Sequence, residues 1–226
     1  WERILLARAK ELKPGGRMIC LNFGIDEQGR HLGTTGGQHM FNLFDRFWKE
    51  LLDVEIGEIP TITYHEAMDR FGRDAPDMRF AMEHTQVDWA GTEFQVVSGA
   101  VEKGGIVKAM VVKGGVEGTS RKVLDGWTEF VKRYRLGGLL WGKVNEDGWS
   151  GPLSKVEEHY RNMIPDVEIG DVVLVAAGPA ARVHAGLGKL REHVARERGL
   201  IPADTFAMVW VVDFPAFEQD EETGNW

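Results

Sequence analysis

An α+β fold is the class that the sequence predicts for residues 80–203 of this 226-residue chain. Strand-like apolar runs and amphipathic helices follow one another in that range, without the strict alternation that builds a parallel sheet. A different order precedes it, because residues 2–23 read as a helix, a Pro-Gly-Gly turn and a short apolar strand, which is an α/β crossover element. Hydrophobic residues make up 43% and charged residues 27% of the chain, which excludes a collagen, a coiled coil and a wholly disordered chain.

Apolar residues at helical and strand spacing predict the elements of the first third of the chain. In order, these are a helix at 2–12, a strand at 17–23, a Gly-rich loop at 24–38 and an amphipathic helix at 39–53. After Pro60 the pattern changes, and Thr63 with Glu66 forms a capping box for a short helix that ends at Gly72.

Strand-like runs become frequent in the second half of the chain. Gly104 and Gly105 separate two of these runs and predict a β-hairpin. Ser120 is suited to cap a helix, and Ser154 with Glu157 makes a second capping box. The elements predicted here are strands at 93–101, 106–112, 138–144, 171–177 and 206–214, and helices at 121–135 and 181–199.

The formal net charge of −8 is unevenly distributed along the chain. Lys and Arg gather over residues 103–135, whereas residues 202–226 contain acidic residues and neither Lys nor Arg. A basic stretch in an acidic protein is compatible with contact to nucleic-acid phosphates, although a solvated charged face is the simpler interpretation.

Several kinds of site and setting are excluded. Cys20 is the only cysteine, so the chain can form neither an internal disulfide framework nor a thiolate zinc cluster. None of the seven histidines belongs to an H-E-x-x-H motif, which argues against a zinc hydrolase. No window reaches the roughly 18 consecutive apolar residues of a membrane span, and with a single cysteine this predicts a cytoplasmic protein. Both ends, Trp1 and Trp226, look cut, so we expect a fragment.

Some single residues have both a functional and a structural interpretation. Asp213 and Glu218 could be paired carboxylates for acid–base work, but a turn before Phe214 and Pro215 is the favoured role of Asp213. The aromatic residues Trp127 and Trp141 are expected in the core, and His184 and His193 on the surface of a helix. Residues 33–37 lack the spacing of a nucleotide-binding turn and are expected to form a flexible loop.

The motifs FGRDAPDMRF (71–80) and WVVDFPAFE (210–218) resemble those of bacterial-type aspartyl-tRNA synthetases. The stretch between them resembles the insertion module of that family, the GAD domain, in VVSGAVEKGGIVKAMVV, WTEFVKRY, KVNEDGW and GLGKLREHVARERGLI. Ala75 departs from the family, which often has Lys there. The resemblance implies a class II core segment at 54–80, a GAD-like domain at 81–203, and a core strand with an acidic tail at 204–226.

The resemblance also implies a function. The parent enzyme is an aspartate–tRNA ligase that uses ATP and Mg²⁺, acts on tRNA and is usually a homodimer. The chain contains neither the motif 2 arginine that holds the α-phosphate nor the motif 3 arginine that stacks on adenine, so we expect this fragment to bind neither cofactor and to be inactive alone. The residues that fit the family's core pattern are Asp74, Asp77, Arg79, Asp213 and Glu218. The candidates for weak electrostatic contact with tRNA are Lys108, Lys113, Arg121, Lys122, Lys132, Arg133 and Arg135.

Two other functions remain open. Residues 1–50, with ELKPGGRM and NFGIDEQGRHLGTTGGQHMFNLF, resemble the end of a class I S-adenosylmethionine-dependent carboxyl methyltransferase. That interpretation makes the chain a chimera joined near residues 47–53, and it lacks the cofactor-binding turn that the reaction needs. The second alternative is a non-catalytic GAD module that binds tRNA.

Overall fold

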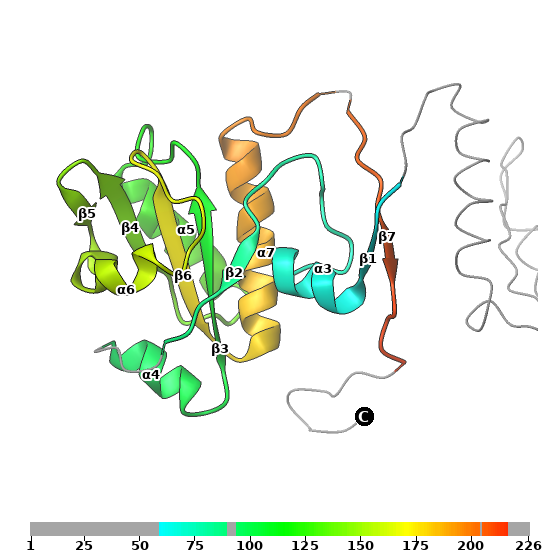
Figure 1. Ribbon diagram of the computed structural model, residues 1–226, viewed down its shortest axis with the longest axis horizontal. Helices are drawn as coiled ribbons and strands as arrows, with labels where there is room; N and C mark the ends of the chain where they lie inside the picture. The colour runs from blue at the N-terminus through cyan, green and yellow to red at the C-terminus, as the bar shows by residue number, and fades with distance from the viewer. Residues whose placement is uncertain (1–58, 90–93, 204, 217–226) are drawn as a thin grey trace, which may run out of the picture. The chain divides into compact units, whose positions relative to one another are not determined.

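The computed structural model describes residues 59–89, 94–203 and 205–216, which belong to a unit that begins at Ile59. The sequence predictions for residues 1–58, including the methyltransferase-like segment and its helices, lie outside these residues, and so does Glu218. Within the described part, an antiparallel sheet and helices on both of its faces make up the main body (Figure 1). This arrangement confirms the α+β class.

The main sheet has five strands in the order β2-β3-β6-β4-β5, and each neighbouring pair is antiparallel. Its strands are β2 (His84–Gln86), β3 (Ile106–Val112), β6 (Val172–Gly178), β4 (Leu140–Asn145) and β5 (Gly148–Ser150). The register of the central pair runs from Ile106 opposite Gly178 to Val112 opposite Val172. Both central strands are buried almost throughout, which the apolar run at 171–177 predicts for β6, whereas β3 was expected to expose Lys108.

Alternation along the central strands directs side chains into two separate cores. On one face, Met110 and Leu174 pack with the helices α5 (Arg121–Lys132) and α7 (Ala180–Glu197). On the other face, Val107 and Val173 pack with smaller elements. These are α4 (Gln95–Val101), the 3₁₀ helix η2 (Pro152–Val156) and α6 (Glu157–Arg161). The sheet is therefore covered on both sides.

A second, two-stranded sheet joins segments from opposite ends of the described chain. Strand β1 (Thr61–Thr63) pairs in parallel with β7 (Trp210–Val212), with Thr61 opposite Trp210. Helix α3 (Tyr64–Phe71) follows β1 and lies between this ribbon and α7 (Figure 1). Because β1 and β7 are paired neighbours, residues 64–209, which connect them, form an insertion between two adjacent strands.

Two of the predicted helix caps are confirmed. The hydroxyl of Thr63 accepts a hydrogen bond from the main-chain N–H of Glu66 at 3.1 Å, and Gly72 ends α3 with a φ of 64°. Ser120 caps α5 in the same way through the N–H of Val123. These ends depend on contacts within four residues, so local sequence was sufficient to predict them.

The predicted strand at 93–101 and its hairpin are wrong. Residues from Gln95 form helix α4, and the main-chain N–H of Gly105 donates to the carbonyl of Ala100, which makes the two glycines a helix end. Both edges of β3 are occupied by β2 and β6, so no edge is left for a hairpin partner. Val97 instead packs over the sheet in the second core.

Three other expectations also need correction. The Ser154 hydroxyl donates to the carbonyl of Gly151, and Glu157 accepts from the N–H of Trp149, so these two residues do not form a capping box. The strand predicted at 206–214 is reduced to the half-buried β7, because it has a single neighbour. His184 is half-buried rather than on the surface, since it lies on the side of α7 that faces α3.

Close contact between α3 and α7 depends on glycine, which gives a prediction for stability. A methyl group at Gly188 would lie 2.7 Å from the carbonyl oxygen of Gly72, whereas one at Gly126 on α5 would have nothing within 4 Å. We expect Gly188→Ala to lower the free energy of unfolding by about 1–2 kcal/mol through overpacking. We expect the control, Gly126→Ala, to raise it by about 0.5–1 kcal/mol, since alanine is the better helix former. Urea denaturation of both variants measures the difference, and equal changes would contradict the close contact.

Candidate functional site

The segment 71–80, which carries the first synthetase-like motif, is held against α7 by a buried arginine. Arg191 is 1% exposed and donates to the carbonyl oxygens of Met82, Asp77 and Phe80 at 3.1, 2.9 and 2.6 Å. Its guanidinium also lies 4.0 Å from the centre of the Phe80 ring. Burial lowers the pKa of Arg191 to about 10, so the side chain stays charged at neutral pH. One side chain thus holds three main-chain carbonyls of residues 77–82 against α7.

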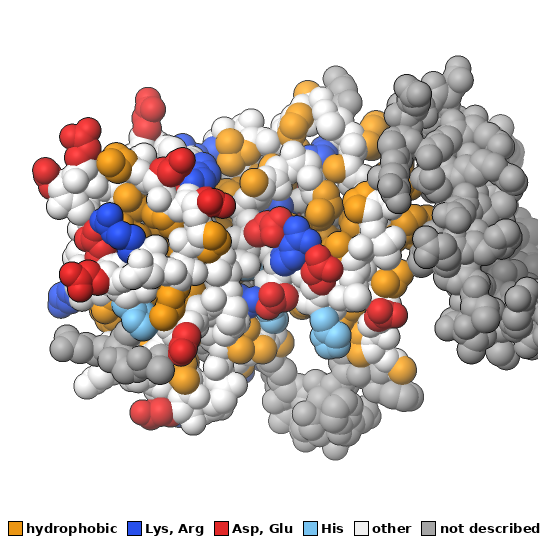
Figure 2. All heavy atoms as spheres, in the orientation of Figure 1, with side chains coloured by type: hydrophobic (Ala, Val, Ile, Leu, Met, Phe, Trp, Pro, Cys, Tyr) orange, Lys and Arg blue, Asp and Glu red, His pale blue; other side chains and the backbone are white. Residues whose placement is uncertain are grey.

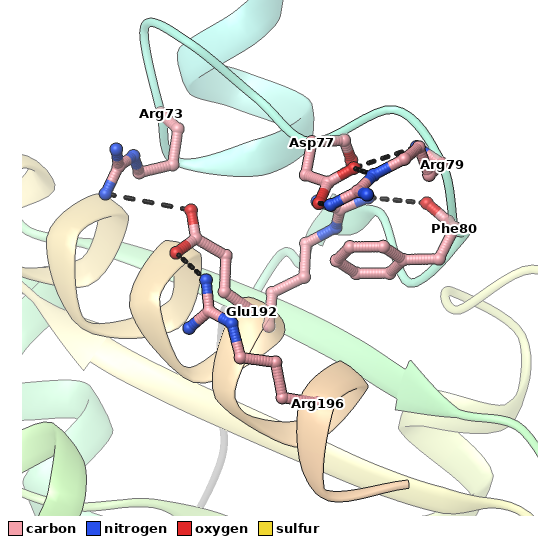
Figure 3. A network of polar contacts seen from close by, with 7 residues as sticks. Arg73, Asp77, Arg79, Phe80, Glu192 and Arg196 are labelled. Carbon is pink, nitrogen blue, oxygen red and sulfur yellow. Dashed lines mark hydrogen bonds and ion pairs between the residues drawn. The ribbon is translucent and has the colours of Figure 1, made fainter. Parts of the chain in front are cut away.

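Asp77 and Arg79 form a local ion pair in the same segment (Figure 3). The Asp77 carboxylate accepts two hydrogen bonds from the Arg79 guanidinium, at 2.9 and 2.7 Å, and one from the Arg79 main-chain N–H at 3.1 Å. This hydrogen bonding holds the pKa of Asp77 below its usual range. The pair therefore helps to fix the backbone whose carbonyl oxygens accept hydrogen bonds from Arg191.

The other residues of the predicted core pattern are not part of this pair. Asp74 is exposed two residues after Gly72, beside Arg73, which lies 3.8 Å from Glu192 of α7 (Figure 3). Asp213 is exposed and has a φ of 58°, a left-handed conformation that turns the chain after β7. Its favoured structural role agrees with this geometry.

A second buried cation ties the sheet to α3. Lys108 of β3 is 1% exposed, and its ammonium group donates to both the carbonyl oxygen and the carboxylate of Asp69. The expectation that Lys108 contacts tRNA is therefore wrong, because its charge is neutralised inside the protein. The alternation of β3 places this residue on the covered face with Met110.

Burial of Lys108 predicts that this lysine contributes nothing to RNA binding. We expect Lys108→Met to change the affinity for a tRNA by less than about twofold, since a buried ammonium group cannot approach a phosphate. Filter binding at low salt measures the affinity, and circular dichroism checks that the variant is folded. A tenfold loss by a folded variant would contradict the assignment.

The remaining candidates for tRNA contact are exposed, but most are already paired. Lys113 lies 3.1 Å from Asp171, Arg121 pairs with Asp125 at 2.9 Å, and Lys132 pairs with Glu129 at 2.6 Å. Arg135 also has a polar or ring contact. Neither Lys122 nor Arg133 has a hydrogen bond or ion pair through its side chain among the described residues. On the face shown in Figure 2, basic side chains are scattered among acidic ones rather than gathered in one patch.

The two tryptophans expected in the core differ in their environments. Trp127 is 2% exposed and donates its indole N–H to Glu197 at 2.8 Å, which confirms a core role. Trp141 is half-buried, and the Arg121 guanidinium lies 5.1 Å from its ring.

A groove runs beside the motif segment between α3 and α7. Its volume is about 530 Å³, and its lining combines aromatic rings with cations. The lining residues are Tyr64, Met68, Gly72, Arg73, Asp74, Tyr134, Ala181, Ala185, Lys189 and Phe214. Asp74 and Phe214, the residue after Asp213, both line this groove.

Sequence reasoning missed Arg191, although a signal was present. Arg191 follows Leu187 by four residues and precedes Val194 by three, so it lies within the apolar stripe of α7. A cation in such a stripe requires buried acceptors. The stripe alone did not identify these acceptors, because they lie more than 100 residues earlier in the chain.

In the ranges 59–89, 94–203 and 205–216, no three His, Cys, Asp or Glu side chains gather in a way that could hold a metal ion. We therefore assign no step to a bound metal in this part of the chain. No helix in the described part of the chain is both long and apolar enough to cross a membrane.

The α+β domain described above contains a segment whose sequence matches a known family. Residues 97–187 match the GAD domain model. The chain is also similar to aspartate–tRNA ligases. It is 41% identical over 187 residues to the aspartate–tRNA ligase of Macrococcus caseolyticus, which covers 80% of this chain and 32% of that protein. The resemblance to bacterial-type aspartyl-tRNA synthetases is thereby confirmed.

Two further relatives are described as aspartate–tRNA(Asp/Asn) ligases. The protein of Halothermothrix orenii is 40% identical over 199 residues, which cover 84% of this chain and 34% of that protein. The protein of Bacillus cytotoxicus is 41% identical over 194 residues, which cover 83% and 33%. The chain spans about a third of the length of these relatives.

Proposed function

We propose that this chain is the insertion-domain part of an enzyme that attaches aspartate to tRNA with the use of ATP. The observation that carries the proposal is the similarity to aspartate–tRNA ligases over 187 residues, a stretch far longer than the GAD match at 97–187. The parallel pairing of β1 with β7 supports it, because both flanks of the insertion contribute to one sheet. A GAD module that works apart from a synthetase core would not need its two flanking segments to pair in one sheet.

In this proposal, the residues of the chain hold the insertion domain rigidly to the catalytic core. Arg191 fixes segment 71–80 from one side, and Lys108 fixes the end of α3 from the other. ATP and Mg²⁺ are bound by parts of the enzyme that these 226 residues do not supply. The chain alone is therefore expected to form no aspartyl-adenylate.

The proposal is tested by a graft. Residues 59–216 replace the corresponding part of the aspartate–tRNA ligase of Bacillus cytotoxicus, and tRNA aspartylation is measured beside the unmodified enzyme. We expect the graft to retain activity within about tenfold, and the 226-residue chain alone to show no aspartate-dependent exchange between ATP and pyrophosphate. A graft that folds but has lost more than a thousandfold in activity would overturn the proposal, as would exchange activity of the chain alone.

A second function, weak tRNA binding without catalysis, is favoured by the GAD match and by Lys122 and Arg133, which have no ion-pair partner among the described residues. We infer an affinity in the micromolar range or weaker that falls with salt, since phosphate contacts release counterions. Filter binding between 50 and 200 mM salt tests it, and an affinity that does not change with salt would contradict it.

A further inference from the structure

A second groove lies on the insertion domain between α5 and α7, away from the motif segment. Its volume is about 490 Å³. The residues that line this α5–α7 groove are Lys122, Val123, Gly126, Trp127, Phe130, Arg133, His193 and Glu197. A methyl group built on Gly126 would have no atom within 4 Å, so the groove is open beside this residue.

Two cations, Lys122 and Arg133, lie at the two ends of the α5–α7 groove. Among the described residues, neither Lys122 nor Arg133 has a hydrogen bond or ion pair through its side chain, although the Arg133 guanidinium lies 5.6 Å from the Phe130 ring centre. Eleven residues separate the two, and eleven residues make about three helical turns, so they lie on the same side of the helix, about 16 Å apart. The other exposed cations of α5, Arg121 and Lys132, are paired with acids and do not line the groove.

Aromatic rings lie between the two cations. The rings of Phe130 and His193 are stacked, with centres 4.3 Å apart and planes 7° from parallel. Glu197 accepts from the Trp127 indole at 2.8 Å and lies 3.2 Å from His193, so its carboxylate is engaged in the middle of the groove. A polyanion would find cations at the ends, rings between them and one carboxylate that discourages a phosphate at the centre.

We propose that the α5–α7 groove binds a single-stranded segment of RNA, with phosphates at Lys122 and Arg133 and a base against the Phe130–His193 pair. Aromatic and histidine rings stack on unpaired bases, whereas a duplex keeps its bases stacked inside and could reach only the cations. The groove therefore suits a single strand better than a helix. This proposal rests on the proposed function, since it names where a tRNA would touch the insertion domain.

The test uses the full 226-residue chain and a fluorescently labelled 12-nucleotide oligouridylate, with a 12-base-pair RNA duplex beside it. The variant Lys122→Ala/Arg133→Ala removes the two groove cations. The matched control, Arg121→Ala/Lys132→Ala, changes the net charge equally on the same helix. By fluorescence anisotropy we expect the groove variant to lose at least tenfold in affinity for the single strand, and the control less than about twofold. The slope of log affinity against log salt should fall by about 1.4 in the groove variant, or about 0.7 for each lost phosphate contact.

A third variant examines the rings. His193→Ala is expected to weaken binding of the single strand by about three- to tenfold without changing the salt slope, because a stacking contact is lost and no phosphate contact is. Equal losses in the groove variant and the control would show that only net charge matters and would overturn the proposal. Binding of the duplex as tight as that of the single strand, or no binding of either, would also overturn it. None of these outcomes changes the aspartylation activity of the graft, which tests the proposed function separately.

Discussion

Replacing Arg191 by methionine is expected to lower the free energy of unfolding by about 3 kcal/mol. The guanidinium makes three hydrogen bonds to main-chain carbonyls, and methionine has a similar volume but no donor. Hydrogen bonds to charged groups contribute about 1.5–3 kcal/mol each, but they are not additive, and carbonyls at the edge of the site regain water. For a domain of this size the loss corresponds to a fall in melting temperature of about 6–12 °C.

Arg196→Ala is the matched control for this experiment. Arg196 lies on the same helix, its side chain is 67% exposed, and it pairs with Glu192 at 3.4 Å (Figure 3). An exposed pair of this kind contributes less than about 1 kcal/mol. Hydrogen exchange should also quicken over residues 71–82 in the Arg191 variant and stay unchanged in the control. A similar loss of stability in both variants would mean that the hydrogen bonds of Arg191 do not hold segment 71–80 against α7.

Acidification from pH 7 to pH 5 is expected to cost the protein about 2 kcal/mol through His84. This residue is 5% exposed, and burial, together with the charges of Arg191 and Lys108, lowers its pKa to about 3. Between pH 6.5 and pH 3 the unfolded chain therefore binds a proton that the folded chain does not bind, so stability falls as the pH falls. The loss approaches about 1.4 kcal/mol per pH unit. His184, whose pKa burial also lowers, adds to the loss in the same direction.

The variant His84→Leu tests this pH dependence. Leucine cannot take up a proton in either state, so the loss of stability between pH 7 and pH 5 should shrink by about 2 kcal/mol. His65→Gln is the control, since His65 is exposed. Urea denaturation at pH 7, 6 and 5 gives the three slopes. If the His84 variant keeps the slope of the unmodified protein, another group is responsible for the loss. The carboxylates Asp77, Glu83 and Glu157 change the stability mainly at lower pH than this, because the pKa of each is lowered in the folded protein.

Much of the candidate site could not be predicted from the sequence. The motif FGRDAPDMRF contains the segment that Arg191 contacts, and the basic stretch at 103–135 contains the helix that lines the α5–α7 groove. The sequence could not separate Lys108, which is buried, from Lys122, which is exposed and has no polar partner among the described residues. Whether a lysine is free depends on which acceptors the fold brings to it, and Asp69 approaches Lys108 across 39 residues.

The sequence by itself determined the elements that depend on contacts between near neighbours. Helix α3 has its cap and its end residue within the local motif, β6 is a continuous apolar run of strand length, and β3 is apolar except for Lys108. Only the tertiary structure decided the fate of residues 95–101, because a short apolar run can be helix or strand until its neighbours in space are known. The tertiary structure also decided the pairing of β1 with β7 and the burial of Arg191, since the partners in both cases are more than 100 residues apart.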